Sequence, residues 1–193
     1  KFYKNNPWDR GHLARRKSLC WGSKKEAIKA NYDSFCWANI TLQHKDINQG
    51  NWGQLEEWVY EKLSLESSNN KLSVFTGPIY GIDSMEYCGS NTPLGCGVFI
   101  PSGFFKVICY VDKNDKLSTI SFIIRQQKYL NIGILSLTEN LKVYEVSIKK
   151  IMEETKIIFP ENIVKSDVYS TTLSTKETID RPKLILTMND IDL

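Results

Sequence analysis

Residues 47–56 read Ile47-Asn48-Gln49-Gly50-Asn51-Trp52-Gly53-Gln54-Leu55-Glu56, and an apolar repeat starts within them. Trp52, Leu55, Val59 and Leu63 follow one another at three- and four-residue intervals, which is typical of an amphipathic helix beginning near Asp46. Asn48 lies near its start, and Glu56 follows eight residues later. In a continuous helix these two polar side chains would therefore point to the same broad side.

A second motif, Asp9-Arg10-Gly11-His12, lies upstream in a segment that we expect to be extended from Lys1 to Arg16. Pro7 disfavours an early helix, and the aromatic residues around it favour a pleated, half-buried environment. A histidine can take a proton from water near neutral pH, and an arginine can neutralise a phosphate. An amide oxygen such as that of Asn48 can hold a hard cation that keeps most of its water shell.

The rest of the chain contains further predicted elements. Short apolar and periodic runs predict a helix over 24–30, a strand over 34–40, a strand over 72–75 that ends in a turn at 76–78, and a Gly-rich loop over 79–98. Residues 103–111 and 117–124 are apolar arms around a polar turn, which predicts a β-hairpin in the middle of a sheet.

The C-terminal part has a weaker pattern. Residues 144–156 predict a helix that ends before Phe159-Pro160, and the Ser/Thr-rich sequence after about Lys165 shows no periodicity. We therefore expect a folded domain over residues 1–163, and an extension or linker over 164–193.

Composition sets the class of protein. With 193 residues, 41% of them hydrophobic, the chain can bury one core. The formal net charge is +3, and the excess of Lys and Arg is concentrated in residues 1–30, where Asp9 and Glu26 are the acidic residues. A basic patch beside His12 suits a polyanionic partner, although a solvated lysine-rich face would have the same composition.

No run approaches the roughly 20 apolar residues that span a bilayer, so no membrane partner is expected. The chain begins with Lys1, which leaves the localisation open.

The five cysteines are odd in number and show no Cys-x-x-Cys spacing, so we do not expect a zinc site. Cys88 and Cys96 flank a loop with Gly and Pro and could pair in an oxidising compartment. We expect the others to be reduced thiols packed as small apolar groups.

These motifs together resemble the DNA/RNA non-specific endonucleases of the ββα-metal superfamily, to which mitochondrial endonuclease G also belongs. The blocks that carry the resemblance are Asp9–Leu13, Asn39–Gln43, Asn48–Trp52 followed by Leu55-Glu56, Phe75–Pro78 and Pro101–Val107. The resemblance implies an α+β fold, the ββα-metal nuclease fold, with a central antiparallel sheet flanked by helices. It also implies a metal-dependent endonuclease that hydrolyses phosphodiester bonds in DNA and RNA.

The resemblance also implies roles for individual residues. His12 would be the general base, Asn48 the sole protein ligand of Mg²⁺ or another divalent cation such as Mn²⁺, and Glu56 would order the metal-bound waters. Arg10 would support the phosphate. Asn39 would be a further catalytic residue, and Gln43 would be a substrate-binding residue.

Two departures from the family pattern affect this assignment. Leu42 stands where the family usually has a proline, which should alter the approach to the helix of Asn48 more than the chemistry. Family members also commonly have an upstream strand with another phosphate-binding arginine, whereas eight residues precede Asp9. Either the chain has lost that segment, or Arg15 and Arg16 supply its charge. We favour these two arginines as substrate-binding candidates, with a solvated basic corner as the alternative.

Three hypotheses follow. The first is a sugar-non-specific endonuclease that contacts the phosphate backbone of DNA and RNA. The second is a nucleic-acid-binding module that has kept the scaffold but lost turnover. The third, compatible with the first, is the nuclease part of a larger toxin or defence protein. Some relatives pair as dimers, and the sequence leaves the oligomeric state open.

Overall fold

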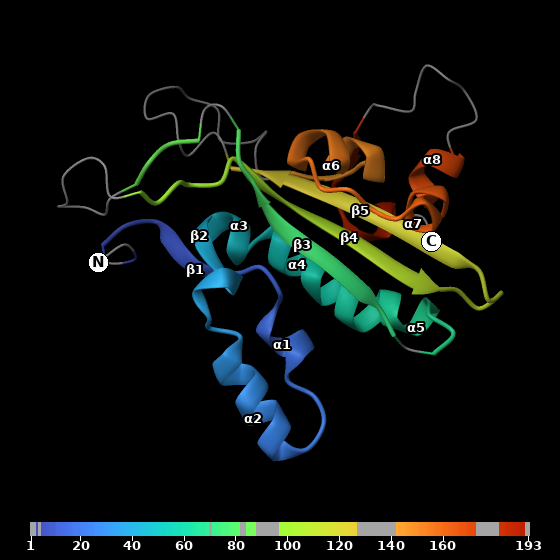
Figure 1. The fold of residues 1–193 in the computed structure, drawn as a ribbon, viewed down its shortest axis with the longest axis horizontal. Helices are drawn as coiled ribbons and strands as arrows, with labels where there is room; N and C mark the ends of the chain where they lie inside the picture. The colour runs from blue at the N-terminus through green and yellow to red at the C-terminus, as the bar shows by residue number, and fades with distance from the viewer. Residues whose placement is uncertain are drawn as a thin grey trace.

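A computed structural model describes residues 3, 5–69, 71–81, 84–87, 97–126, 142–172 and 182–191. Its centre is a five-stranded antiparallel sheet in which neighbouring strands follow the chain order. The strands are β3 (Ser73–Ile79), β4 (Gly103–Val111), β5 (Leu117–Arg125), β6 (Val143–Glu145) and β7 (Lys183–Ile185). Helices lie on both faces of this sheet (Figure 1), as predicted for the fold class.

The predicted hairpin is confirmed, because β4 and β5 pair along their whole length from Gly103↔Arg125 to Val111↔Leu117. Alternation along β4 sends Phe104 and Ile108 into one apolar core and Phe105 and Val107 into another. The hairpin is therefore buried on both faces and holds the two layers of helices together.

The first core lies against α4 (Asn51–Trp58) and the π-helical turn η2 (Val59–Leu63), which leads into α5 (Ser64–Glu66). The four residues of the predicted apolar face are all buried, and they are Trp52, Leu55, Val59 and Leu63. The second core packs α6 (Ile148–Thr155) and α7 (Glu161–Lys165) on the opposite face of the sheet.

The helix expected from Asp46 onward is not continuous between Asn48 and Glu56, which was the condition for placing both side chains on one side. The chain forms α3 (Lys45–Asn48) and then α4, with a break at Gln49–Gly50. A Cβ atom at Gly50 would overlap the carbonyl oxygen of Asp46, so the close approach of the two backbone segments requires glycine. The two polar residues therefore belong to separate helices.

The predicted strand over 34–40 is also wrong. The helix predicted over 24–30 extends further, as α2 (Lys24–Asp33), and is followed by the 3₁₀ turn η1 (Trp37–Asn39) and then β2 (Ile40–His44). The side-chain amide of Asn39 donates to the carbonyl oxygen of Ser34, which closes the turn that the apolar pattern concealed. Of the predicted extended N-terminal segment, β1 (Trp8–His12) is the strand, and α1 (Arg16–Leu19) begins at its end.

Thr76-Gly77-Pro78 is part of β3 and not a turn. A Cβ atom at Gly77 would lie 2.8 Å from the ring of Phe105, which is too close. Glycine is therefore needed for this cross-strand contact. Pro78 is tolerated because β3 is at the edge of the sheet and has one unpaired side.

Within the described residues, the last part of the chain contains more regular structure than its pattern predicted. The start of the predicted helix over 144–156 is instead β6, and α6 begins after Ser147, whose hydroxyl accepts from the backbone N–H of Lys150. Beyond Lys165 lie α8 (Val168–Thr172), β7 and the 3₁₀ turn η4 (Met188–Asp190). The division at residue 163 stays a prediction, and β7 of the central sheet lies beyond it.

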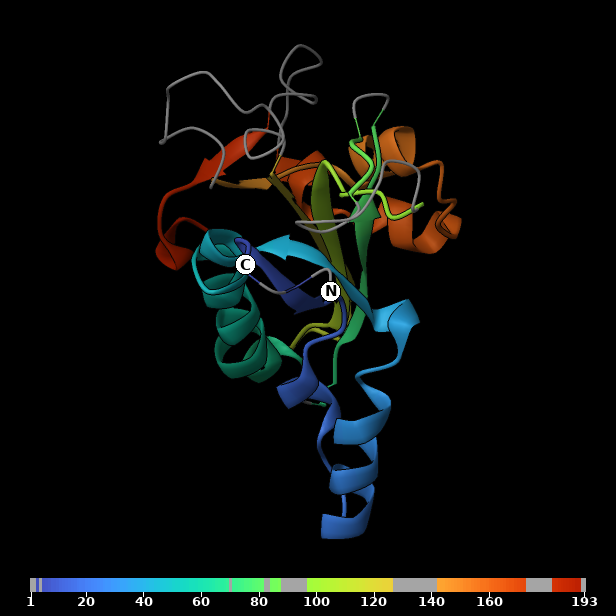
Figure 2. The same cartoon turned by 90° about the vertical axis from the view of Figure 1, so that its left-hand side faces the viewer.

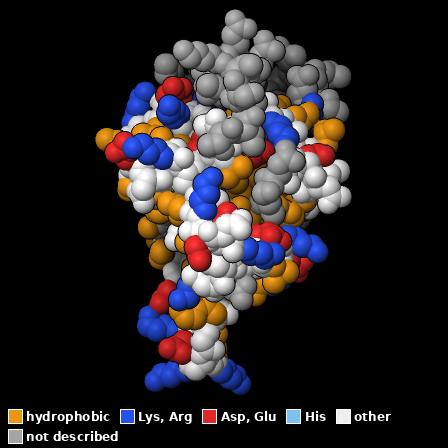
Figure 3. Space-filling model, turned by 90° about the vertical axis from the view of Figure 1, so that its right-hand side faces the viewer, with side chains coloured by type: hydrophobic (Ala, Val, Ile, Leu, Met, Phe, Trp, Pro, Cys, Tyr) orange, Lys and Arg blue, Asp and Glu red, His pale blue; other side chains and the backbone are white. Residues whose placement is uncertain are grey.

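In Figure 3, basic and acidic side chains are interspersed over one side of the molecule. No helix within the described ranges is long and apolar enough to cross a bilayer.

Cys20, Cys36 and Cys109 are free thiols. Cys88 and Cys96, for which a disulfide was considered, lie outside the described residues.

Candidate active site

The candidate site is built on a two-stranded ribbon in which β1 and β2 are antiparallel, with His12 opposite Ile40 and Arg10 opposite Leu42. Figure 2 shows this ribbon beside the central sheet, with α2 projecting from it. The packing of α3 against both strands brings Asn48 to the ribbon. The two sequence motifs therefore meet at this small sheet.

His12 is half-buried and held on two sides. Its Nε2 lies 3.3 Å from the Ser34 hydroxyl oxygen. The Phe35 ring packs edge-on against the imidazole, with 4.6 Å between ring centroids. These contacts fix the orientation of the ring at the end of β1.

The surroundings of His12 lower its pKa. Burial is the main cause, and the nearby Arg16 cation acts in the same direction. The Glu56 carboxylate and a hydrogen bond to the Arg10 backbone raise the pKa and offset part of the effect. The imidazole is therefore neutral at neutral pH, which is the protonation state that a general base needs.

Asn39 fixes the segments on either side of His12. Its Oδ1 accepts from the backbone N–H of Ala14 at 2.8 Å, and its Nδ2 donates to the carbonyl oxygens of Ala14 and Ser34 at 3.1 and 2.9 Å. Because the Asn39 amide is hydrogen-bonded to backbone groups, the geometry supports a role for Asn39 in positioning the segments around His12. Its assignment as a catalytic residue stays a prediction.

The side chain of Asn48 is oriented by the aspartate of the first motif. Asn48 Nδ2 donates to Asp9 Oδ2 at 2.9 Å, and Gln49 Nε2 donates to the same oxygen at 2.8 Å. A carboxylate accepts hydrogen bonds and cannot donate them, so the amino end of the amide must face Asp9. The Oδ1 atom of Asn48 is then the end left for a cation.

Glu56 forms a buried ion pair that sequence reasoning missed. Lys106 Nζ lies 2.8 Å from Glu56 Oε1, and the two side chains are 4% and 12% exposed. The ammonium group also donates to the Leu13 carbonyl oxygen and the Thr76 hydroxyl oxygen, both at 3.3 Å, and lies 5.0 Å from the centroid of the Trp52 ring. Because Leu13 follows His12, this lysine connects the carboxylate on α4 with the end of β1.

The predicted basic residues have different environments. Arg10 is exposed and lies 5.5 Å from the centroid of the Tyr3 ring. Arg15 pairs with Glu57, and this carboxylate also pairs with Lys17. The two cations lower the pKa of Glu57 to about 2, so an internal partner offsets the charge of Arg15. Arg16 is exposed, and within the described part of the chain it makes no ion pair.

Gln43 is buried, with 1% of its surface exposed. It packs against Gly11, where a Cβ atom would overlap the Gln43 side chain. Its contact is therefore with the β1 backbone, and the substrate-binding role assigned to Gln43 stays a prediction that this geometry does not support.

A family model described as DNA/RNA non-specific endonuclease matches residues 1–166. The chain belongs to this family. Among relatives, a protein of Sinorhizobium fredii named uncharacterized protein y4fB is 36% identical over 86% of this chain and 25% of its own length. A nuclease of Serratia marcescens is 37% identical over 52% of this chain and 34% of its own length. The chain thus spans about a quarter to a third of these relatives.

A solved structure shares the fold of this endonuclease-family chain. It is titled as a crystal structure of the EndoG/EndoGI complex and the mechanism of EndoG inhibition. The match has a TM-score of 0.57 and 22% identity, and it covers 81% of this chain and 60% of the other. The likeness confirms the predicted ββα-metal nuclease fold.

Endonucleases of this family depend on a divalent metal, and the residues present fit such an ion. Within the described ranges, no group of three or more His, Cys, Asp or Glu side chains is arranged to enclose a metal. The Asn48 amide oxygen stays the predicted protein ligand, with the Glu56 carboxylate predicted to contact the waters of the ion. A hard ion such as Mg²⁺ keeps several waters and takes few protein ligands, so this arrangement suits a hydrated divalent cation.

Arg16→Ala is expected to shift the acid limb of the pH profile of kcat/KM to higher pH. Removing this cation removes an interaction that lowers the pKa of His12, so the imidazole should become protonated at a higher pH. The profile of plasmid cleavage measures the shift. Arg15→Ala is the matched control, because Arg15 pairs with Glu57 and has no part in the pKa shift of His12. Equal shifts in both variants, or none in Arg16→Ala, would contradict the prediction.

Lys106→Met is expected to lower the free energy of unfolding by about 2–3 kcal/mol, because it leaves the Glu56 carboxylate buried without its cation. Urea unfolding followed by circular dichroism measures this loss. The double variant Glu56→Gln/Lys106→Met should recover part of it, since the uncompensated charge is gone. If the loss of unfolding free energy in the double variant equals the sum of the losses in Glu56→Gln and in Lys106→Met, the pair is not coupled.

Proposed function

We propose that this chain is a metal-dependent, sugar-non-specific endonuclease that hydrolyses phosphodiester bonds in DNA and RNA. One observation carries the proposal: a histidine that its surroundings keep neutral is connected through Leu13 and Lys106 to a buried carboxylate. An amide held by Asp9 lies at the same strand. Membership of the endonuclease family supports the reaction class.

The chemistry of each residue follows from its contacts. His12 Nε2, beside the Ser34 hydroxyl, would accept the proton of the attacking water, while the Arg10 backbone and the Phe35 ring hold the imidazole. Arg10, which is exposed on β1, would neutralise charge on the phosphate as it forms in the transition state. Phosphate contacts position a strand without reading its sequence, and DNA and RNA share a phosphodiester backbone, so such contacts would suit both substrates.

The cation would be held by Asn48 Oδ1, with Glu56 hydrogen-bonding its waters. A bound divalent ion supplies Lewis acidity at the phosphate and charge stabilisation at the departing oxygen. Lys106 would fix the Glu56 carboxylate in place through their ion pair.

The test is cleavage of supercoiled plasmid, single-stranded DNA and RNA side by side with Mg²⁺ or Mn²⁺, followed by addition of a chelator. The proposal predicts cutting of all three substrates that the chelator stops. Purified protein that leaves them intact in every divalent metal would overturn it. Steep salt-dependent binding without cutting would instead identify a nucleic-acid-binding module.

A further inference from the structure

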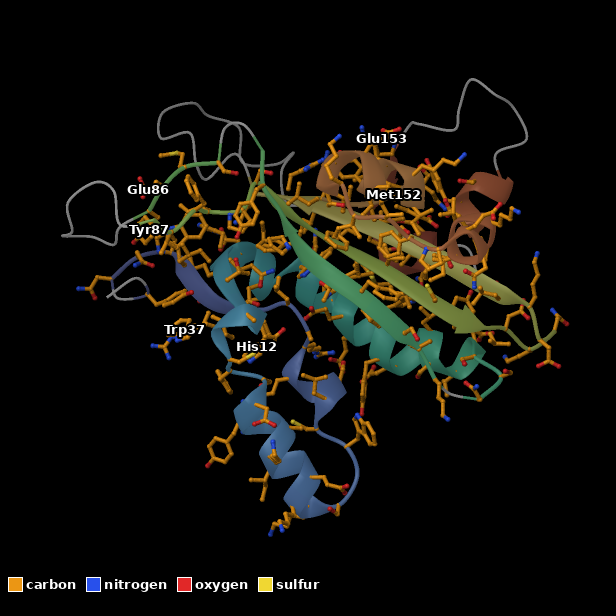
Figure 4. The ribbon with its side chains drawn as sticks, viewed as in Figure 1. His12, Trp37, Glu86, Tyr87, Met152 and Glu153 are labelled. Carbon is orange, nitrogen blue, oxygen red and sulfur yellow. The ribbon has the colours of Figure 1, made fainter. Side chains whose placement is uncertain are left out.

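A groove of about 540 Å³ lies along β2, beside the strand that carries His12. Its walls include four aromatic side chains, and they are Tyr3, Trp37, Tyr80 and Phe99. Ile40, Thr41 and Leu42 of β2 also line it, and these pair with His12, Gly11 and Arg10 of β1. Trp37 lies in the same part of the molecule as His12 (Figure 4). The groove therefore adjoins the candidate active site.

Tyr3 packs against a small buried cluster, but the other three aromatic side chains of this groove are largely exposed. Trp37 is 77% exposed, Tyr80 53% and Phe99 52%. Exposed apolar surface gathered around a hollow marks a place where a ligand or partner binds. Flat rings with accessible faces suit a flat ligand, because stacking covers both surfaces at once.

The charge around the groove selects among flat ligands. The described residues that line it include no Asp or Glu. The Arg10 cation lies beside one wall, 5.5 Å from the centroid of the Tyr3 ring. Aromatic faces combined with a cation are what a nucleobase and its phosphate require, whereas an apolar peptide or a lipid tail would not use the cation.

We propose that this groove binds unpaired bases of single-stranded DNA or RNA, stacked on Trp37, with a backbone phosphate at Arg10. The inference rests on the proposed function and adds a substrate preference to it. Bases inside a duplex are stacked on each other and do not expose their faces. The groove therefore favours single strands, while the phosphate contacts at the active site serve both forms.

The test measures binding in chelator, without cleavage, of labelled oligothymidylate and of a short duplex to the full chain. Trp37→Ala should weaken oligothymidylate binding by roughly 5- to 100-fold, the range for loss of one stacked base, and leave duplex binding unchanged. Trp37→Phe should retain most of the affinity. Trp21→Ala is the matched control, because Trp21 is equally exposed at 76% but lies outside this groove.

Salt dependence separates stacking from charge. Trp37→Ala should lower affinity without changing the slope of log affinity against log salt, whereas Arg10→Ala should reduce that slope by about 1. A merely structural effect of Trp37 would weaken duplex and single strand alike. That result, or equal effects of Trp37→Ala and Trp21→Ala, would overturn the groove proposal.

Parallel plasmid cleavage by the wild-type chain keeps the two proposals apart. Metal-dependent cutting together with no selective effect of Trp37→Ala would overturn the groove alone. Selective loss of single-strand binding in Trp37→Ala without any cutting by the wild-type chain would overturn the endonuclease proposal alone.

Discussion

Replacing His12 with alanine is expected to lower kcat for plasmid cleavage by about 10²- to 10⁴-fold, the contribution typical of a positioned general base. The expectation follows from the lowered pKa of His12 and from the Ser34 and Phe35 contacts that orient its ring. Because the imidazole is neutral at the working pH, its removal should weaken DNA binding little. The measurement is single-turnover cleavage under saturating Mg²⁺.

Two controls separate loss of the base from loss of the fold. The His12→Ala protein should bind DNA at low salt with wild-type affinity. Imidazole added to the buffer should restore part of its activity, because a free base can occupy the space of the missing ring, which is only half-buried. Cleavage by His12→Ala at the wild-type rate would remove this residue from the mechanism. A variant that neither binds DNA nor gives a wild-type circular dichroism spectrum would show a folding defect, for which His12→Gln is the substitute.

The spacing of apolar residues alone predicted the parts of the fold in which buried positions recur at a regular interval. The hairpin of β4 and β5 has two apolar arms around a polar turn, and the buried face of α4 has regular helical spacing. Both could be predicted because their apolar periodicity depends on the burial of each element alone.

Elements defined by tertiary contacts could not be predicted in this way. The break between α3 and α4 depends on the close approach of Gly50 to the Asp46 carbonyl, which the helical spacing of the apolar residues does not show. Pro78 reads as a turn residue, and it is accepted in β3 because that strand is at an edge. The three residues of β7 are too few to show a period, and pairing with β6 defines them.

The candidate site shows the same division. His12, Asn48, Glu56 and Arg10 could be selected from their motifs, because general-base, cation and phosphate chemistry each need a particular residue type. The contacts that prepare them could not be selected. One feature of the sequence pointed to Lys106. It is a single charged residue in an apolar strand, and it lies on the same side of that strand as Phe104 and Ile108, which face the core. Its partner on α4 is distant in sequence and emerges only in the folded chain.

Asn48→Ala is expected to raise the Mg²⁺ concentration for half-maximal cleavage by more than about 100-fold. Loss of an outer partner of a metal ligand typically costs 10- to 100-fold in affinity or activity, so loss of the proposed ligand itself should cost at least as much. A titration of plasmid cleavage against Mg²⁺ measures the change. Binding of DNA in chelator should be unaffected, because the substitution removes no charge.

Asp9→Ala tests the orientation of the amide independently of its presence. This variant keeps Asn48 but frees its Nδ2, so the amide can rotate and present either end to the cation. Its half-maximal Mg²⁺ concentration should lie between those of the wild type and Asn48→Ala. Asp9→Asn retains an acceptor oxygen and should recover much of the loss. Asn51→Ala, at the start of α4, is the control for loss of an amide nearby. Wild-type Mg²⁺ dependence in Asn48→Ala would show that the cation is held elsewhere, because this substitution removes the proposed ligand atom and leaves Glu56 and Lys106 in place.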